Sequence, residues 1–538
     1  MVVLAALVGV VTGLLVAGFE AVVRDGAFEA VMRRPLRIAM WIPLAGLAAT
    51  ALVRRLSGSD GRTTDAYVIA YHQRGGEMRL RDLPATVLAS ALTLGSGTGM
   101  GYEGPAMLIG GTVGSFAERR FTWRFRQDDA KILMVAGAAA GVAAVFKAPL
   151  TGMVFALEVP YTQDLARRAL LPALIAASTS YLTFVAFLGT APVLSIGGVS
   201  PFELRDLAGA IALGVLSGLL ARLGAWAIAA AKGLRAPIVW RIVGFGLALA
   251  GLAVWSDRVF GGPLTMGSGY GAIEWTRAHE QGVALLALLF AMRFASTWCT
   301  VAAGGVGGLF IPLVCQGAVL GGFMQSIVHA QNGALLPTVG IAAFLGAGYR
   351  TPIAGVAFVA EATGQPGFVV PALLAAAAAQ LAIGRWSFTA YQRDQRQVSL
   401  TPTDEMSLGD IMSANPDTVR ADMPLSESVR LMMTTNRRWV PVVDAGAYAG
   451  LLSITDAARV PADDWANTQT GSLVRTIPAA RTTDSVAEAA ERIRAGGVGA
   501  LAVTDGERVV GVVTIRDIAN VERLLELLGP DDAEDQAH

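Results

Sequence analysis

The stretch GMGYEGPAMLIGG (residues 99–111) places one carboxylate, that of Glu103, among glycines and apolar side chains. Glu103 is the only charged residue between Leu83 and Ala117. Burying a carboxylate in apolar surroundings is costly, and glycine-rich breaks leave backbone N–H groups without helical partners. We therefore take Glu103 as the first candidate functional residue and ask what surroundings make its burial useful.

The composition around this stretch is that of a membrane protein. The 538 residues are 54% hydrophobic and 16% charged, with a mean hydropathy of +0.52. Apolar runs recur up to about residue 390, and several reach the roughly 20 residues that a helix needs to cross a bilayer. We predict an all-α, multi-pass membrane domain over residues 1–395. Acidic side chains at that depth usually mark functional sites.

Charge and the rarer residues argue against several functions. The formal net charge is zero, which disfavours a nucleic-acid partner. Cys299 and Cys315 lie in apolar surroundings, and the four histidines form no metal-binding motif. We therefore expect neither a metal site nor an enzyme.

The sequence after Gly384 changes to a charged, soluble type. The motifs GLLSITD (450–456) and GVVTIRD (511–517) align as a tandem repeat of strands and helices. We expect a C-terminal α/β pair with these bounds: linker 396–404, first module 405–460, second module 461–529 and tail 530–538.

Each C-terminal module places a hydroxyl three residues before an aspartate. The pairs are Ser453 with Asp456 and Thr514 with Asp517. At a strand-to-helix junction this spacing suits a nucleotide, with the carboxylate on a ribose and the hydroxyl near phosphate. Ordinary capping of the helix start is the alternative, and it is the more frequent use of these residue types.

A second repeat lies within the apolar region. Residues 137–158 match residues 340–361 at an offset of 203, including Pro149 with Pro352 and Glu158 with Glu361. The same offset pairs residues 101–114 with 304–317 through Gly101/Gly304, Gly104/Gly307 and Gly114/Gly317. Such duplications are typical of transporters, whose sites lie where broken helices of the two halves meet.

The two glycine-rich breaks, 101–105 and 307–312, each precede an apolar run. A helix that begins there has free N–H groups and a partial positive charge at its start. Two such starts would form an anion site without a fixed cation, which favours release of the ion. Close packing of helices through glycine is the alternative interpretation.

The motifs GYEGP, GGLFIP and FKAPLTGMVFALE resemble those of the CLC family of chloride channels and chloride/proton exchangers, and the C-terminal pair resembles CBS modules. The resemblance implies two inverted halves, a homodimer in a membrane, and Glu103 as the gating glutamate. A carboxylate at the anion's place would block the path, and its protonation or displacement would open it. The resemblance implies an anion site formed by Gly101, Gly104, Pro105, Gly308, Leu309, Phe310 and Ile311.

The resemblance also implies a CBS pair in the cytoplasm, which accommodates ATP or another adenine nucleotide. We expect the membrane to be a bacterial inner membrane, the transported ion to be chloride or a similar small anion, and no cofactor to be required.

Two positions depart from the family's pattern around the anion. The segment GRTTDA (61–66) places Arg62, followed by Thr63, where the family has a serine beside the ion, and GSDG (58–61) is a weaker alternative for this position. Arg62 would either strengthen anion binding or point aside to water. The family's central tyrosine corresponds to Phe388, which has no hydroxyl, with Tyr391 as the alternative.

A third departure concerns protons. The family's internal proton-transfer glutamate corresponds to Val159, which cannot carry a proton. This favours passive, channel-type conduction, while the adjacent Glu158 keeps a chloride/proton antiporter as the alternative. Pairing of Glu158 with a nearby Arg or Lys, as Glu361 would pair in the other half, is a purely structural role. A CBS-bearing magnesium permease would need more acidic residues along its path.

Overall fold

The computed structural model describes residues 1–121, 131–191, 203–278, 281–330, 332–364, 366–394, 406–496 and 498–528. The chain divides into two compact units, Met1–Arg396 and Gln397–His538. The predicted linker 396–404 and tail 530–538 lie outside the described residues.

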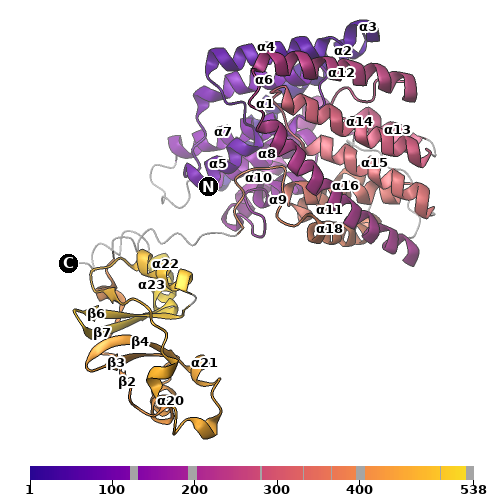
Figure 1. Ribbon diagram of the computed structural model, residues 1–538. Helices are drawn as coiled ribbons and strands as arrows, with labels where there is room; N and C mark the ends of the chain where they lie inside the picture. Colours follow the sequence, from indigo (N-terminus) through magenta and orange to yellow (C-terminus); the bar gives the residue numbers. More distant parts are fainter. Residues whose placement is uncertain are drawn as a thin grey trace. The chain divides into compact units, whose positions relative to one another are not determined.

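The first unit is built from helices throughout its described residues (Figure 1). Its first half contains α1 (Val2–Glu20), a π-helical turn (Ala21–Phe28), α2 (Glu29–Met32), α3 (Leu36–Ala39), α4 (Ile42–Ser57), α5 (Thr64–Gln73), α6 (Leu83–Gly95), α7 (Glu103–Phe121), α8 (Ile132–Phe146), α9 (Pro149–Glu158) and α10 (Leu170–Leu188). Its second half contains α11 (Leu204–Lys232), α12 (Ile238–Phe260), α13 (Tyr270–Ala278), α14 (Val283–Ala302), α15 (Phe310–Val328), α16 (Leu335–Tyr349), α17 (Pro352–Thr363) and α18 (Val369–Ile383).

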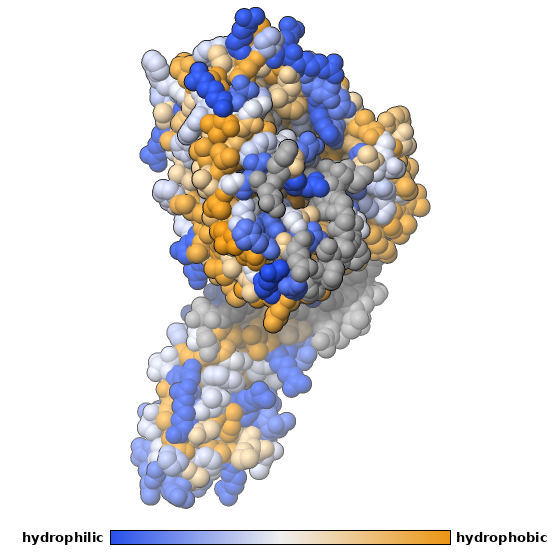
Figure 2. Space-filling model, turned by 90° about the vertical axis from the view of Figure 1, so that its right-hand side faces the viewer, coloured by the Kyte–Doolittle hydropathy of each residue, from blue (hydrophilic) through white to orange (hydrophobic). Residues whose placement is uncertain are grey.

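This unit has the surface of a membrane protein. Among the described residues, seven helical segments are long and apolar enough to span a bilayer. Figure 2 shows hydrophobic side chains over large areas of one face of this unit. Apolar side chains such as Val239 and Trp240 are 64% and 72% exposed, which suits contact with lipid. The predicted all-α, multi-pass fold is confirmed.

The two halves repeat one arrangement of helices. Helix α8 lies between α7 and α9, as α16 lies between α15 and α17. The α8 and α16 helices, with 15 residues each, keep the predicted offset of 203. The close contact of α7 with α8 joins Gly110 to Gly137, and that of α15 with α16 joins Gly317 to Gly340.

These contacts correct the predicted register of the first repeated block. Gly110 corresponds to Gly317, so α7 and α15 are related by an offset of 207 rather than 203. The corrected offset pairs Pro105 with Pro312 and Glu103 with Phe310. The prediction was wrong by four residues, about one helical turn, because glycines recur every three or four residues there and match in either register.

The second unit contains two small sheets and repeats its own pattern. One sheet has the strand order β2-β3-β4 and the other β1-β7-β6-β5. The strands are β1 (Ser413–Ala414), β2 (Val419–Arg420), β3 (Trp439–Asp444), β4 (Ala447–Ser453), β5 (Ala480–Arg481), β6 (Ala500–Asp505) and β7 (Arg508–Thr514). The helices are α19 (Leu408–Ile411), α20 (Leu425–Thr434), α21 (Ile454–Ala457), α22 (Val486–Gly496) and α23 (Ile515–Leu528). The β3–β4 and β6–β7 hairpins share a register irregularity at equivalent positions, which confirms the tandem α/β repeat.

Candidate functional site

The two glycine-rich breaks meet directly. The Gly101 N–H donates to the Gly308 carbonyl at 2.9 Å, and the Gly308 N–H donates to the Gly101 carbonyl at 2.8 Å. The segments run antiparallel at this crossing, as expected for inverted halves. Pro105 and Pro312 are each the third residue of the following helix, where a missing N–H costs nothing. Two helix starts therefore converge in the buried centre of the unit.

Glu103 is the first residue of α7, and its side chain lies at the start of α15. Its side chain is 1% exposed, and its Oε1 accepts the Phe310 N–H at 2.5 Å. The Ile311 N–H also faces this carboxylate. The start of α15 carries the positive end of the helix dipole, so the protein's own anion lies where a free anion would bind. Glu103 Oε2 has no hydrogen-bond partner in the part of the chain that the structure describes.

This approach of the carboxylate requires glycine at the crossing. A Cβ atom on Gly308 would lie 1.8 Å from Glu103 Oε1, and one on Gly101 would lie 2.2 Å from Oε2. A Cβ atom on Gly104 would lie 2.6 Å from Thr63 Oγ1. The glycines therefore provide the volume that the carboxylate fills, beyond any effect on helix packing.

An aromatic cluster fixes the start of α15. The Phe310 ring stacks on Phe146 at 4.2 Å and meets Phe155 and Phe358 edge-on at 5.1 and 5.3 Å between centroids. Tyr349 is the fourth ring, 6.4 Å from Phe310. The repeat at offset 203 relates Phe146 to Tyr349 and Phe155 to Phe358, so each half contributes an equivalent pair of rings around Phe310.

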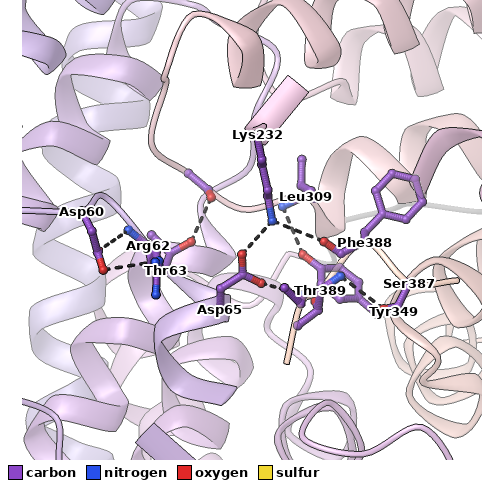
Figure 3. Close-up of polar contacts among 12 residues, drawn as sticks. Asp60, Arg62, Thr63, Asp65, Lys232, Leu309, Tyr349, Ser387, Phe388 and Thr389 are labelled. Carbon is purple, nitrogen blue, oxygen red and sulfur yellow. Dashed lines mark hydrogen bonds and ion pairs between the residues drawn. The ribbon is translucent and has the colours of Figure 1, made fainter. Parts of the chain in front are cut away.

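Tyr349 also reaches the helix start itself, which the sequence analysis missed. The Leu309 N–H donates to the Tyr349 hydroxyl oxygen at 3.2 Å (Figure 3). Consecutive N–H groups at the opening of α15 therefore bind a phenol and a carboxylate. The signal in the sequence was the change from Phe146 to Tyr349 between otherwise similar repeats.

Arg62 points aside from the crossing. Its guanidinium lies 3.4 Å from the Asp60 carboxylate, and its centre lies 5.7 Å from the Tyr391 ring. The Arg62 side chain therefore points aside rather than toward the anion site, which was the second of its two expected roles. Thr63 does contact the crossing, because its hydroxyl donates to the Gly307 carbonyl at 2.9 Å (Figure 3).

The candidate aromatic residues after Gly384 differ in their placement. Phe388 is 5% exposed, and its N–H donates to the Gly348 carbonyl at 2.9 Å. Its backbone therefore lies beside the end of α16. Tyr391 is 47% exposed and meets Arg62 rather than the helix start.

The ion pair between Lys232 and Asp65 holds the segment that contains Phe388 and Ala390. Lys232, the last residue of α11, contacts the Asp65 carboxylate at 2.7 Å, and its ammonium lies 3.4 Å from the Phe388 carbonyl oxygen. Asp65 also accepts the Ala390 N–H at 3.1 Å. Sequence reasoning did not single out Asp65 or Lys232, because their partners are distant along the chain.

Glu158 and Glu361 each accept backbone N–H groups at the start of a helix in the other half of the unit. Glu158 accepts the N–H groups of Ile353 and Ala354 at 3.2 and 2.8 Å. Glu361 accepts those of Leu150 and Thr151 at 2.8 and 2.6 Å. The structural alternative that we gave for Glu158, pairing with an Arg or Lys, is not what the described residues show, because the free N–H groups at the starts of α17 and α9 bind the two acids instead. Val159 follows Glu158 and is fully buried.

The four C-terminal candidates make local contacts. Ser453 Oγ accepts the Thr455 N–H, and the Thr514 hydroxyl and N–H both donate to Asp517. Asp456 binds the Arg475 guanidinium through both oxygens at 2.6 and 2.8 Å. Arg475 lowers the pKa of the Asp456 carboxyl below its usual value. Helix capping accounts for Ser453, Thr514 and Asp517, and Asp456 is held by an arginine.

Comparisons with known families match the helical unit and the C-terminal unit separately. The model of the voltage gated chloride channel family matches residues 45–384, and the CBS domain model matches residues 408–463 and 472–523. The H(+)/Cl(-) exchange transporter ClcA of Citrobacter koseri is 28% identical over 406 residues, which are 70% of this chain and 84% of that protein. The ClcA protein of Salmonella typhimurium is 27% identical, with the same shares covered.

Solved structures share the fold. A slow cyanobacterial Cl−/H+ antiporter gives a TM-score of 0.63 at 22% identity, covering 71% of this chain and 93% of that one. A eukaryotic CLC transporter gives 0.60 at 18% identity, covering 96% and 97%. With its family model matched over most of the helical unit and a CBS pair after it, the chain belongs to the voltage gated chloride channel family.

Proposed function

We propose that this protein exchanges chloride for protons, with Glu103 as both the gate and the proton carrier. The observation that carries the proposal is the bond between the Glu103 carboxylate and the Phe310 N–H. A free anion can bind this helix start only after the carboxylate leaves it. Protonation removes the negative charge that holds Glu103 there, so proton uptake and anion entry are linked at one position.

The relatives support exchange over passive conduction. The similar bacterial proteins are named H(+)/Cl(-) exchange transporters. Chloride is accordingly the anion that we propose.

Passive conduction is the second candidate, and it has its own observation. Val159 cannot carry a proton, and both oxygens of Glu158 are bound to N–H groups of α17. A chain without an inner proton carrier would conduct chloride with no proton movement. We favour exchange because the carboxylate fills the anion's place, which obliges Glu103 to move whenever an anion passes.

Proteoliposomes separate the two candidates. With the full chain reconstituted, an imposed chloride gradient should drive protons uphill, followed with a pH-sensitive dye. Chloride flux without proton movement would support the channel and refute exchange.

We further propose a homodimer in a bacterial inner membrane, with the CBS pair in the cytoplasm. The family resemblance and the bacterial relatives support this. Light scattering of the detergent-solubilised chain, corrected for detergent, would give a dimer mass, and a monomer would refute the proposal.

An adenine nucleotide at the CBS pair is our proposal for regulation. The support is the matched CBS pair. Titration of the full chain with ATP should show binding that weakens in Asp517→Ala, and the absence of ATP binding would refute it.

A further inference from the structure

The hydroxyl of Tyr349 lies at the opening of α15 and has a buried, fixed position. The side chain is 2% exposed, and its ring packs edge-on against Phe155 at 5.1 Å. The oxygen accepts the Leu309 N–H at 3.2 Å (Figure 3), and the Thr64 hydroxyl adjoins it. A phenol can accept one hydrogen bond and donate another, and its hydrogen rotates to the partner that is present.

Tyr349 is therefore next to the position that an anion takes. Leu309 and Phe310 supply successive N–H groups, and the second of these binds the Glu103 carboxylate at 2.5 Å. An anion that replaces this carboxylate sits beside the phenol. The hydroxyl can then donate its hydrogen to the anion while its oxygen keeps the Leu309 N–H.

The residue at the position of the family's central tyrosine supplies no hydroxyl here. Phe388 has only a ring, and its backbone is hydrogen-bonded to Gly348, the residue before Tyr349. The two aromatic residues thus come from adjoining backbone segments. A hydroxyl missing from one segment is present on the other.

The internal repeat shows that packing alone does not require this hydroxyl. At the position equivalent to Tyr349, the first half has Phe146, which stacks on Phe310 without any polar group. The Phe146–Phe358 and Tyr349–Phe155 contacts are equivalent, at 5.4 and 5.1 Å between centroids. The ring fills the same space in both halves, and the hydroxyl is the addition.

We propose that Tyr349 supplies the hydroxyl hydrogen bond to the transported anion at the start of α15, in place of Phe388. This inference rests on the proposed anion transport. It assigns the specificity-determining hydroxyl to the end of α16, a position outside the motifs that identify the family.

The test measures chloride binding to the full chain in detergent by calorimetry. Tyr349→Phe should weaken chloride binding about tenfold, the value of one hydrogen bond to a charged group. Tyr349→Phe combined with Phe388→Tyr should recover part of the loss. Tyr67→Phe is the matched control, because the buried Tyr67 hydroxyl donates to the Ala156 carbonyl at 2.8 Å, so its loss should lower the Tm and leave chloride affinity unchanged.

The outcomes separate this inference from the proposed function. Equal chloride affinity in wild type and Tyr349→Phe overturns the role of Tyr349 and leaves anion transport standing. The same holds if Tyr67→Phe weakens binding as much as Tyr349→Phe does, because the effect is then one of stability. A wild-type chain that binds no chloride overturns both proposals.

Discussion

The two halves of the membrane unit share a scaffold and differ in two side chains that matter for chemistry. Each half provides a glycine at the crossing, a proline in the first turn, a pair of rings around Phe310, and a glutamate that caps the other half. At equivalent positions, however, the first half has Glu103 where the second has Phe310. The second half has Tyr349 where the first has Phe146. The duplication therefore builds the helix starts, and the departures from it supply the carboxylate that we propose as the gate and the hydroxyl that we propose for the anion.

The largest effect should come from the residue that breaks the symmetry most. Glu103→Gln removes the only carboxylate at the crossing among the described residues, and we expect chloride-driven proton transport to fall to background while chloride still crosses. Proton and chloride fluxes in proteoliposomes measure this. Proton transport that persists in Glu103→Gln would mean that another acid carries the proton.

The shared glycines should give the next largest effect. Gly308→Ala places a Cβ atom 1.8 Å from Glu103 Oε1, in the volume that either the carboxylate or an anion fills. We expect both fluxes to fall by about tenfold or more, because overpacking costs on the order of 1–3 kcal/mol. Gly251→Ala is the control, since among the described residues no atom outside its own stretch of helix lies within 4 Å of its Cβ position. Normal fluxes in Gly308→Ala would show that the helix start is not the ion's path.

The reciprocal caps give a matched pair of smaller effects. Glu158→Gln and Glu361→Gln each replace an oxygen that accepts a backbone N–H, which should cost about 1–3 kcal/mol of stability in either case. Thermal unfolding of the full chain in detergent measures this cost. We expect the coupling of protons to chloride to survive in both variants. Uncoupling in Glu158→Gln alone would assign the proton route to Glu158 and break the equivalence of the halves.

The smallest effect tests the same logic in the C-terminal repeat. Asp456 binds Arg475, whereas its counterpart Asp517 caps a helix. Because Arg475 lowers the Asp456 pKa, this pair stabilises the fold above the ordinary aspartate pKa of about 3.9 and loses its effect as the pH falls through the lowered value. Arg475→Ala should reduce the Tm at pH 7 by a few degrees and have progressively less effect on acidification. An effect independent of pH would contradict the ion pair's role.

The sequence predicted features that depend on local pattern. The membrane domain, the tandem C-terminal repeat and the buried Glu103 at a glycine-rich helix start all follow from composition and spacing. The register of α7 against α15 did not, because glycines spaced by one turn match equally well in two registers and only the contacts of Gly110 and Gly317 decide between them.

The remaining differences depend on partners far away in the chain. Tyr349 was missed because its hydroxyl binds a backbone N–H that any residue could supply, and Phe-to-Tyr differences look conservative. The Arg62 guanidinium lies beside Tyr391, which is distant in the chain, as well as beside the neighbouring Asp60. For Glu158 the sequence left a proton role and a cation partner open, and it gave no sign that backbone N–H groups at the start of α17 bind the carboxylate.

The central claim is that Glu103 takes up a proton when an anion replaces its carboxylate at the start of α15, and proton uptake on chloride binding tests it most directly. Chloride is added to the unbuffered full chain in detergent near neutral pH while a pH electrode follows the solution. The account predicts proton uptake on chloride binding by the wild type and none by Glu103→Gln. Chloride binding by the wild type without proton uptake would contradict it.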